Sequence, residues 1–168
     1  MRIGKRFEFF GKHIVRKLIG HILKPVQGKP DVAKKGAFSR ILVVRQDSRL
    51  GNLVLMTPML QGLRAVFPGA VIDLLISEGF EEIAANNPNV DNLVVFKKQK
   101  ARVKPWTYIG FIKELKKRKY DCAIDVSDGH HFSLNNVLLT CLSGARCRLG
   151  YDRGDARFFL NLVVPPPR

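Results

Sequence analysis

Residues 41–77 read ILVVRQDSRLGNLVLMTPMLQGLRAVFPGAVIDLLIS, and the order of their patterns decides the fold. A β-branched run (41–45) is followed by apolar residues spaced three and four apart (53–67) and by a second apolar run (71–77). These patterns predict a buried strand, a helix and another buried strand. Pro58 inside the helical stripe predicts a kink or a late start of the helix.

The alternation of strand and helix patterns continues along the chain. We expect helices at 79–87, 106–119 and 134–144, and strands at 91–96, 122–127 and 147–151. Apolar strands separated by helices predict an α/β fold, a Rossmann-like doubly wound parallel sheet with right-handed crossovers. The apolar residues of the helical stripes are assigned to the core, and they include Leu53, Met56, Leu60, Trp106 and Ile109.

Composition favours a globular domain with an anionic partner. Of 168 residues, 46% are hydrophobic, which is enough for one sizeable core. The chain has 29 Lys+Arg and 14 Asp+Glu, a net charge of +15, so a phosphate-bearing lipid, a nucleic acid or a nucleotide is the expected class of partner. Cys122, Cys141 and Cys147 lie in apolar segments without C-x-x-C spacing, which predicts reduced core thiols in a cytoplasmic protein and no zinc site.

The first forty residues form a separate compositional unit, with 11 Lys or Arg and 2 Asp or Glu. Residues 1–24 have the spacing of a basic amphipathic helix, and 25–39 read as a linker. Such a helix can lie on an anionic membrane, or it can pack on its own domain or a partner with a solvated basic face. Basic residues interrupt any signal-peptide core. The expected membrane-surface residues are Phe7, Phe10, Ile14, Lys17 and Leu18.

The polar loop RQDSRLGN (45–52) lies between the first strand and the first helix. In a parallel sheet this position is at the carboxyl edge, where ligands bind and where helix N–H groups favour an anion. Arg45 and Arg49 could clamp a phosphate or carboxylate, and Gly51 lets the backbone approach it closely. The loop matches neither GxGxxG nor the P-loop pattern, which disfavours a dinucleotide or P-loop site.

Several separated motifs carry a resemblance to a known family. They are RQDSRLGN with the following TP, the FPGA turn, NNPNVDNLVVF (86–96), KYDCAIDVS (119–127) and LSGARCRLGYDRG (142–154). Over residues 40–160 the chain resembles the N-terminal half of glycosyltransferase family 9, the ADP-heptose:lipopolysaccharide heptosyltransferases. The resemblance implies the acceptor domain of a two-domain GT-B enzyme, whose second domain holds the nucleotide sugar.

The resemblance also implies a reaction. A carboxylate takes the proton of the acceptor hydroxyl while the nucleoside diphosphate leaves, with inversion and without a metal or cofactor. The implied partners are a nucleotide sugar such as ADP-heptose, a lipopolysaccharide-core acceptor and the anionic inner face of a bacterial inner membrane. Nucleic acid is not an expected partner under this reading.

The family's base position holds Asn52, and an amide cannot accept the proton. Asp47 in the same loop and Asp128 after the fourth strand are the candidate catalytic carboxylates. Asp47 could instead cap the helix or pair with Arg49. Adjacent histidines cannot point to one side of a regular element, so no metal site is expected. The expected acceptor or anion contacts are Arg45, Ser48, Arg49, Gly51, Asn52, His130 and His131.

Residues 161–168 (NLVVPPPR) are expected to begin an interdomain linker, with the donor-binding domain absent. An isolated acceptor half should be inactive. The alternative is a non-catalytic, basic Rossmann-like module that binds nucleic acid or anionic lipid. The segment KKQKARVKPWTY (97–108) mixes bases with aromatics as a nucleic-acid binder does, although basic loops of parallel-sheet proteins are more often solvated or face lipid phosphates.

Overall fold

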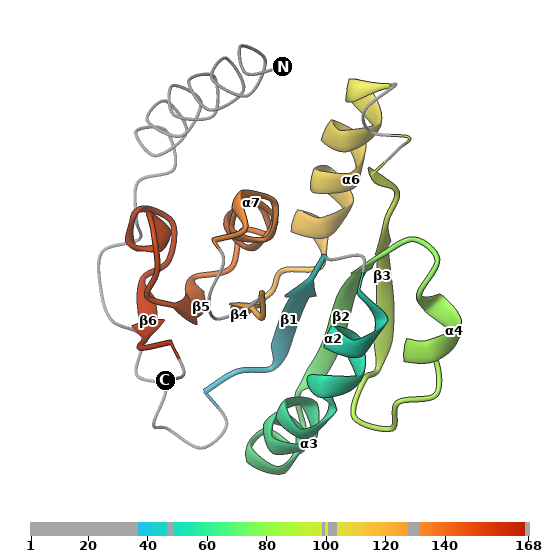
Figure 1. Cartoon of the computed structure of the whole chain (residues 1–168), viewed down its shortest axis with the longest axis vertical. Helices are drawn as coiled ribbons and strands as arrows, with labels where there is room; N and C mark the ends of the chain where they lie inside the picture. Colours follow the sequence, from blue (N-terminus) through green and yellow to red (C-terminus); the bar gives the residue numbers. More distant parts are fainter. Residues whose placement is uncertain (1–36, 47–48, 99, 101–103, 128–131, 167–168) are drawn as a thin grey trace, which may run out of the picture.

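The computed structural model describes residues 37–46, 49–98, 100, 104–127 and 132–166. Its strands form one parallel sheet in the order β3-β2-β1-β4-β5-β6 (Figure 1). The strands are β1 (Arg40–Arg45), β2 (Val71–Ser77), β3 (Asn92–Phe96), β4 (Cys122–Asp125), β5 (Cys147–Tyr151) and β6 (Leu162–Val164). This order is that of a doubly wound Rossmann-like sheet, which confirms the predicted fold class.

The helices alternate with the strands as the sequence predicts. They are α2 (Leu50–Leu55), α3 (Thr57–Val66), α4 (Glu81–Ala84), α6 (Pro105–Lys117), α7 (Leu134–Leu142) and the 3-10 helix η1 (Ala156–Phe158). The stripe that contains Pro58 is two helices, because α2 ends before Met56 and α3 begins at Thr57. Proline is tolerated there because the first turn of a helix needs no N–H from it.

Both faces of the sheet are covered (Figure 1). Alternate residues of β1 point to opposite sides, so Val43 packs in the cluster that contains Leu60 of α3, whereas Val44 packs with Leu115 of α6 and Leu139 of α7. Leu53, Met56 and Leu60 are all buried, as predicted. The three cysteines are also buried and free, which confirms the prediction of reduced core thiols.

Two aspartates that directly precede strands bind the backbone at the start of the neighbouring strand. Asp121, before β4, accepts hydrogen bonds from the backbone N–H groups of Ser39 and Arg40 at 2.8 and 2.9 Å. Asp91, before β3, accepts one from the N–H of Ile72 at 2.7 Å. Backbone N–H groups at the start of a strand need hydrogen-bond acceptors, and these two aspartates provide them, so both have a structural role.

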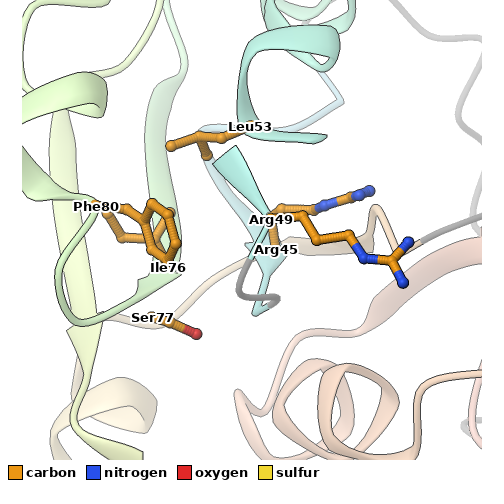
Figure 2. A pocket seen from close by; sticks show the side chains of 6 residues that line it. All are labelled: Arg45, Arg49, Leu53, Ile76, Ser77 and Phe80. Atoms are coloured by element: carbon orange, nitrogen blue, oxygen red, sulfur yellow. The ribbon is translucent and has the colours of Figure 1, made fainter. Parts of the chain in front are cut away.

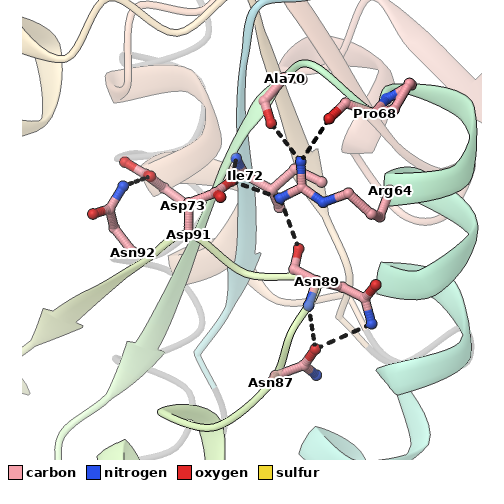
Figure 3. Close-up of polar contacts among 9 residues, drawn as sticks. All are labelled: Arg64, Pro68, Ala70, Ile72, Asp73, Asn87, Asn89, Asp91 and Asn92. Carbon is pink, nitrogen blue, oxygen red and sulfur yellow. Dashed lines mark hydrogen bonds and ion pairs between the residues drawn. The ribbon is translucent and has the colours of Figure 1, made fainter.

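Arg64 in the last turn of α3 joins the FPGA turn to the segment before β3 (Figure 3). Its guanidinium donates to the carbonyl oxygens of Ala70 at 2.7 Å and Asn89 at 3.3 Å and to the carboxylate of Asp91 at 2.6 Å. Burial opposes the ionisation of Asp91, but the hydrogen bond from Ile72 and the contact with Arg64 outweigh it, so the pKa of this carboxyl is lowered.

The assignment of Trp106 and Ile109 to the core is wrong. Their side chains are 64% and 58% exposed, whereas Ile112 and Leu115 of the same helix are buried. Residues three apart in an α-helix fall about 60° short of a full turn, so a stripe with this spacing moves around the helix at each step. Over the three steps from Trp106 to Leu115 the shifts add up, and Trp106 lies on the side opposite Leu115.

The sixth strand was not expected. The sequence predicts the start of an interdomain linker at 161–168, but residues 162–164 pair with β5, with Val163 beside Gly150, so the sheet continues beyond residue 160. A three-residue strand before a run of prolines offers too short a pattern to recognise. The predicted helix at 1–24, with Phe7, Phe10, Ile14, Lys17 and Leu18, lies outside the described residues, as do 25–36 of the linker. Among the described helices, none combines the length and apolarity needed to cross a bilayer.

Candidate anion-binding site at the carboxyl edge of the sheet

The strand order reverses at β1. This strand pairs with β2 on one side and with β4 on the other, and Val44 lies beside Asp125 near the carboxyl ends. The chain moves outward from β1 to β3 and then returns to place β4 on the free side of β1. Connections that diverge in this way leave a crevice above the carboxyl ends of the two central strands, which is the usual ligand position in such sheets.

The end of β1 is held by β4 and α7. Arg45 donates from Nη1 to the carbonyl oxygen of Val126, and the N–H of Val126 donates to Val44 at 3.1 Å. The N–H of Gln46 donates to Oδ1 of Asn136 in the first turn of α7 at 3.1 Å. The start of the polar loop is therefore fixed to both elements that border the crevice.

The other described residues of the loop, 49–52, form the amino end of α2. Arg49 occupies the N-cap and is exposed, and its carbonyl oxygen accepts the N–H of Asn52 at 3.2 Å. A Cβ at Gly51 would meet no atom within 4 Å, so the described packing does not require glycine there. Because α2 has only six residues, the positive charge where β1 passes into α2 comes from the two arginine side chains and not from a helix dipole.

A shallow pocket lies beside these arginines, between the carboxyl ends of β1 and β2 (Figure 2). Its apolar side chains come from α2, β2 and the segment after β2, and both arginine side chains extend away from Phe80 and Ile76. The lining residues are Arg45, Arg49, Leu53, Ile76, Ser77 and Phe80. This notch has almost no open volume and cannot enclose a sugar ring, so the chemical character of this edge lies in the exposed Arg49 beside it, which suits an anionic group.

A buried polar cluster stands on the other side of the crevice. Oδ1 of Asp125, the last residue of β4, accepts the N–H and the hydroxyl of Ser127 at 2.9 and 2.5 Å. Arg153 donates to the carbonyl oxygen of Ser127 at 3.3 Å and to its hydroxyl, and its Nη2 lies 3.6 Å from Oδ2 of Asp125. Ser127 is therefore held between a carboxylate and a guanidinium.

The electrostatics of Asp125 indicate a structural carboxyl group. Burial raises its pKa, and the hydrogen bonds from Ser127 and the positive charge of Arg153 only partly oppose the shift. The Asp125 side chain is 1% exposed and that of Arg153 is 8% exposed. A carboxylate enclosed in this way cannot approach an acceptor hydroxyl, so its role is to position the backbone that follows β4.

Gly150 of β5 makes room for this cluster. A Cβ at this position would lie 2.7 Å from Cδ1 of Leu160 and 3.2 Å from Cβ of Asp125. Arg153 itself lies over the ring of Tyr151, with 5.6 Å between Cζ and the ring centroid. The glycine and arginine of the LGYDRG segment thus have physical roles beside the crevice.

The structure brings together four of the predicted contacts, namely Arg45, Arg49, Gly51 and Asn52, at the carboxyl end of β1. The remaining predicted residues lie outside the described residues, and they are Asp47, Ser48, Asp128, His130 and His131. Residues not predicted from the sequence are Asp125, Ser127, Asn136 and Arg153. The available signal was the aspartate in the apolar run CAID, since a buried carboxylate requires partners. Among the described side chains, no group of three or more His, Cys, Asp or Glu could hold a metal ion.

Comparison with known proteins identifies similar sequences. The chain is 29% identical over 104 residues to lipopolysaccharide heptosyltransferase 3 of Escherichia coli, and this match covers 61% of this chain and 29% of that protein. It is 30% identical over 124 residues to lipopolysaccharide heptosyltransferase 1 of Pseudomonas aeruginosa, and this match covers 70% of this chain and 34% of that protein. The chain therefore spans about a third of the length of these curated relatives. No protein-family model matches it.

Solved structures share the fold. The E. coli heptosyltransferase WaaC with ADP-2-deoxy-2-fluoro heptose superposes with a TM-score of 0.65 at 21% identity, over 77% of this chain and 43% of that chain. A family 9 glycosyl transferase from Veillonella parvula superposes with a TM-score of 0.59 at 22% identity, over 74% and 40%. Over the region covered by these matches, the chain belongs to the heptosyltransferase-like proteins of glycosyltransferase family 9.

Proposed function

We propose that this chain is the acceptor-binding half of a glycosyltransferase that moves a sugar, heptose in this proposal, from a nucleotide sugar to lipopolysaccharide core or a related glycan. The names of the curated relatives support this class of reaction. The donor, ADP-heptose in this proposal, binds in a second domain that corresponds to the remaining length of the relatives. The chain by itself then binds acceptor but does not turn over.

One observation carries the proposal. Arg45 and Arg49 stand at the carboxyl end of the central strand, beside an apolar notch and next to the switch point of the sheet. Guanidinium groups bind phosphate and carboxylate in two-point contacts, and an inner-core glycan presents such groups. Arg49 is exposed and would contact the anionic substituent directly, whereas Arg45 is buried and bound to the Val126 carbonyl oxygen, so it would support this contact through its charge.

The proposed reaction is a direct, inverting displacement. A carboxylate removes the proton of the acceptor hydroxyl, the oxygen attacks the anomeric carbon, and the bond to the nucleoside diphosphate breaks. Asn52 cannot act as this base, and Asp125 is enclosed. The proposal therefore assigns the role to Asp47 or Asp128. No metal or cofactor takes part, because cationic side chains stabilise the leaving diphosphate.

The proposed location is the cytoplasmic face of the inner membrane. Residues 1–24 would lie on the anionic lipid surface, with the aromatic and aliphatic side chains of the helix among the acyl chains and Lys17 near lipid phosphates. An acceptor that carries a lipid anchor is presented at that surface, so peripheral attachment would bring the candidate site to its substrate.

Acceptor binding is tested by titrating the whole chain with lipopolysaccharide-core oligosaccharide. We expect Arg49→Gln to weaken binding about tenfold or more, because a charged contact to an anionic group is lost. Arg157→Gln is the matched control, since Arg157 pairs with Asp152 and does not line the pocket beside Arg49. Equal affinity of the two variants, or no binding by the unaltered chain, would refute the proposed acceptor site.

The base is tested in a fusion of this chain to the donor-binding half of a heptosyltransferase relative. In that fusion, Asp47→Asn and Asp128→Asn are compared for the rate of sugar transfer at saturating substrate. We expect one of them to lose about a hundredfold or more in rate, which is the usual contribution of general-base catalysis. If both variants keep the full rate, neither carboxylate is the base.

Asn52 at the family's base position favours one alternative, a non-catalytic module that binds nucleic acid or anionic lipid. Duplex DNA provides the contrasting ligand in the same titration. Tighter binding to DNA than to core oligosaccharide, with an affinity that falls steeply as salt rises, would favour the module over the enzyme.

A further inference from the structure

The amino end of α6 carries two exposed apolar side chains. Trp106 and Ile109 lie one turn apart, 64% and 58% exposed, on the helix that buries Ile112 and Leu115 against the sheet. Large side chains can be exposed singly without consequence, but an exposed tryptophan next to an exposed isoleucine forms an apolar patch. The patch has no function in holding the sheet together.

The surroundings of this patch are strongly cationic. Lys97, Lys98 and Lys100 precede the helix, and the one acidic residue of α6, Glu114, pairs with Lys117 at 2.6 Å. Lys98 and Lys104, on the amino-terminal side of the patch, are exposed, and Lys113 is exposed one turn after Ile109. An apolar centre with a lysine rim is complementary to a surface that offers anionic groups above an apolar interior.

A hollow adjoins the patch between the end of β3 and the start of α6. Its volume is about 250 Å³, with an aromatic wall from Phe96 and Phe111 and with Lys97 and Lys100 among its lining. The hydroxyl of Thr107, which also lines it, donates to the carbonyl oxygen of Lys104 at 2.7 Å. The α6 residues that line the hollow, Thr107 and Phe111, lie on another side of the helix than Trp106 and Ile109, so the hollow is a neighbouring cationic feature and not a part of the patch.

This surface faces the same edge of the sheet as the candidate site. β3 ends at Phe96 and α6 begins at Pro105, so the amino end of α6 lies at the carboxyl edge of the strands (Figure 1). Arg45 also ends its strand at that edge. A flat partner that covers the α6 surface would thus lie beside the crevice and not behind the sheet.

We propose that the amino end of α6 docks on an anionic phospholipid bilayer, with Trp106 and Ile109 entering the interface and the surrounding lysines near lipid phosphates. Tryptophan is enriched at membrane interfaces, and each lysine adds electrostatic attraction to an anionic leaflet. Ile109 argues for a bilayer over nucleic acid, because an aliphatic side chain neither stacks well on bases nor pairs with phosphates. This surface is separate from residues 1–24 and does not depend on the proposed enzyme function.

Trp106 is the single tryptophan of the chain, so its fluorescence reports on this surface alone. The whole chain is titrated with phosphatidylglycerol–phosphatidylcholine vesicles and with pure phosphatidylcholine vesicles. We expect the anionic vesicles to shift the emission to the blue and brominated acyl chains to quench it, with both effects weakened by salt. Vesicle binding without any change in Trp106 emission would overturn the proposal, because other residues would then carry the attachment.

Variants test the two components of the surface. Lys98→Gln and Lys104→Gln should each weaken vesicle binding about fivefold, and Ile109→Ser should weaken it about tenfold. Val66→Ser is the control, because Val66 is exposed at the end of α3, at the opposite edge of the sheet. Equal vesicle affinity of Ile109→Ser and Val66→Ser would contradict the proposal, as would stronger quenching of Trp106 by duplex DNA than by anionic vesicles.

Discussion

Asp125 and Arg153 form an ion pair at the carboxyl edge of the sheet, with 3.6 Å between Oδ2 and Nη2 and with both side chains almost excluded from solvent. The pair joins the end of β4 to the segment after β5, and Ser127 is bound to both partners. These contacts tie residues 125–127 at the end of β4 to the segment after β5.

Removal of Arg153 should strongly destabilise the fold. Arg153→Met leaves Asp125 buried with its hydrogen bonds to Ser127 but without a cation, and breaking a buried pair in this way typically costs about 3–5 kcal/mol. Urea unfolding followed by circular dichroism measures the loss. Arg157→Met, which removes an exposed ion pair with Asp152, should leave the unfolding midpoint almost unchanged. Similar midpoints for the two variants would show that the buried pair does not stabilise the chain.

Asp91 should make stability depend on pH in the acidic range. Its pKa is lowered in the folded state, so the unfolded chain binds the proton first as the pH falls. The stability from ionised Asp91 is therefore present at neutral pH and is lost as the pH falls below about 4, the ordinary value for aspartate. Asp91→Asn keeps an oxygen acceptor for Ile72 but not the charge.

The measurement for Asp91 is the free energy of unfolding of both forms at several pH values between 7 and 3. We expect the unaltered chain to be more stable at pH 7 and the difference to narrow on acidification. A difference that is independent of pH would mean that the charge of Asp91 does not contribute.

Two glycine-to-alanine substitutions should have opposite signs. Gly150→Ala places a methyl group 2.7 Å from Leu160 Cδ1 and 3.2 Å from Asp125 Cβ, so overpacking should destabilise the fold by about 1–3 kcal/mol. Gly62→Ala adds a methyl group in α3 with no atom within 4 Å, and it should stabilise the chain by about 0.5–1 kcal/mol. Thermal unfolding compares the two, and the same sign for both would contradict the packing described around Gly150.

The hydroxyl of Tyr120 should stabilise a buried aspartate in β2. It donates to Oδ2 of Asp73 at 2.7 Å, and Arg118 donates to the same oxygen at 2.7 Å. Asp73 is fully buried, so Tyr120→Phe should cost about 1–3 kcal/mol. Tyr151→Phe is the control, because the Tyr151 hydroxyl forms no hydrogen bond within the described residues.

The pH dependence of Tyr120 has the opposite sign to that of Asp91. Burial and the hydrogen bond to Asp73 raise its pKa, so the unfolded chain ionises first as the pH rises. Its contribution should be complete below about pH 10, the ordinary tyrosine value, and should be lost above it. A Tyr120→Phe chain as stable as the Tyr151→Phe chain throughout this range would exclude the proposed contribution.

Much of the fold follows from local patterns. The bounds of β2 and β5 match the predicted strands at 71–77 and 147–151, because continuous apolar runs are typical of strands buried on both faces. The Rossmann-like class follows from the alternation of these runs with helices. Trp106 shows where such reasoning ends, since apolar residues spaced by three do not remain on one face of a helix.

Local sequence patterns predict only one half of the candidate site. The polar loop after β1 stands out because Arg45 and Arg49 follow a buried strand, whereas nothing local connects Asp125 with Arg153. The sequence offers 29 lysines and arginines as partners for that aspartate. Only the pairing of β4 with β5 brings the segment that carries Arg153 next to it.

The sequence by itself determined the first five strands and the helices between them, where the polar loop falls, and how strongly cationic the chain is. These properties depend on the period of apolar residues and on composition, both of which act over a few neighbouring positions. The tertiary structure alone decided that β4 lies beside β1 and that Asp125 and Arg153 meet. Those outcomes depend on strand pairing and desolvation between distant segments, which no local pattern records.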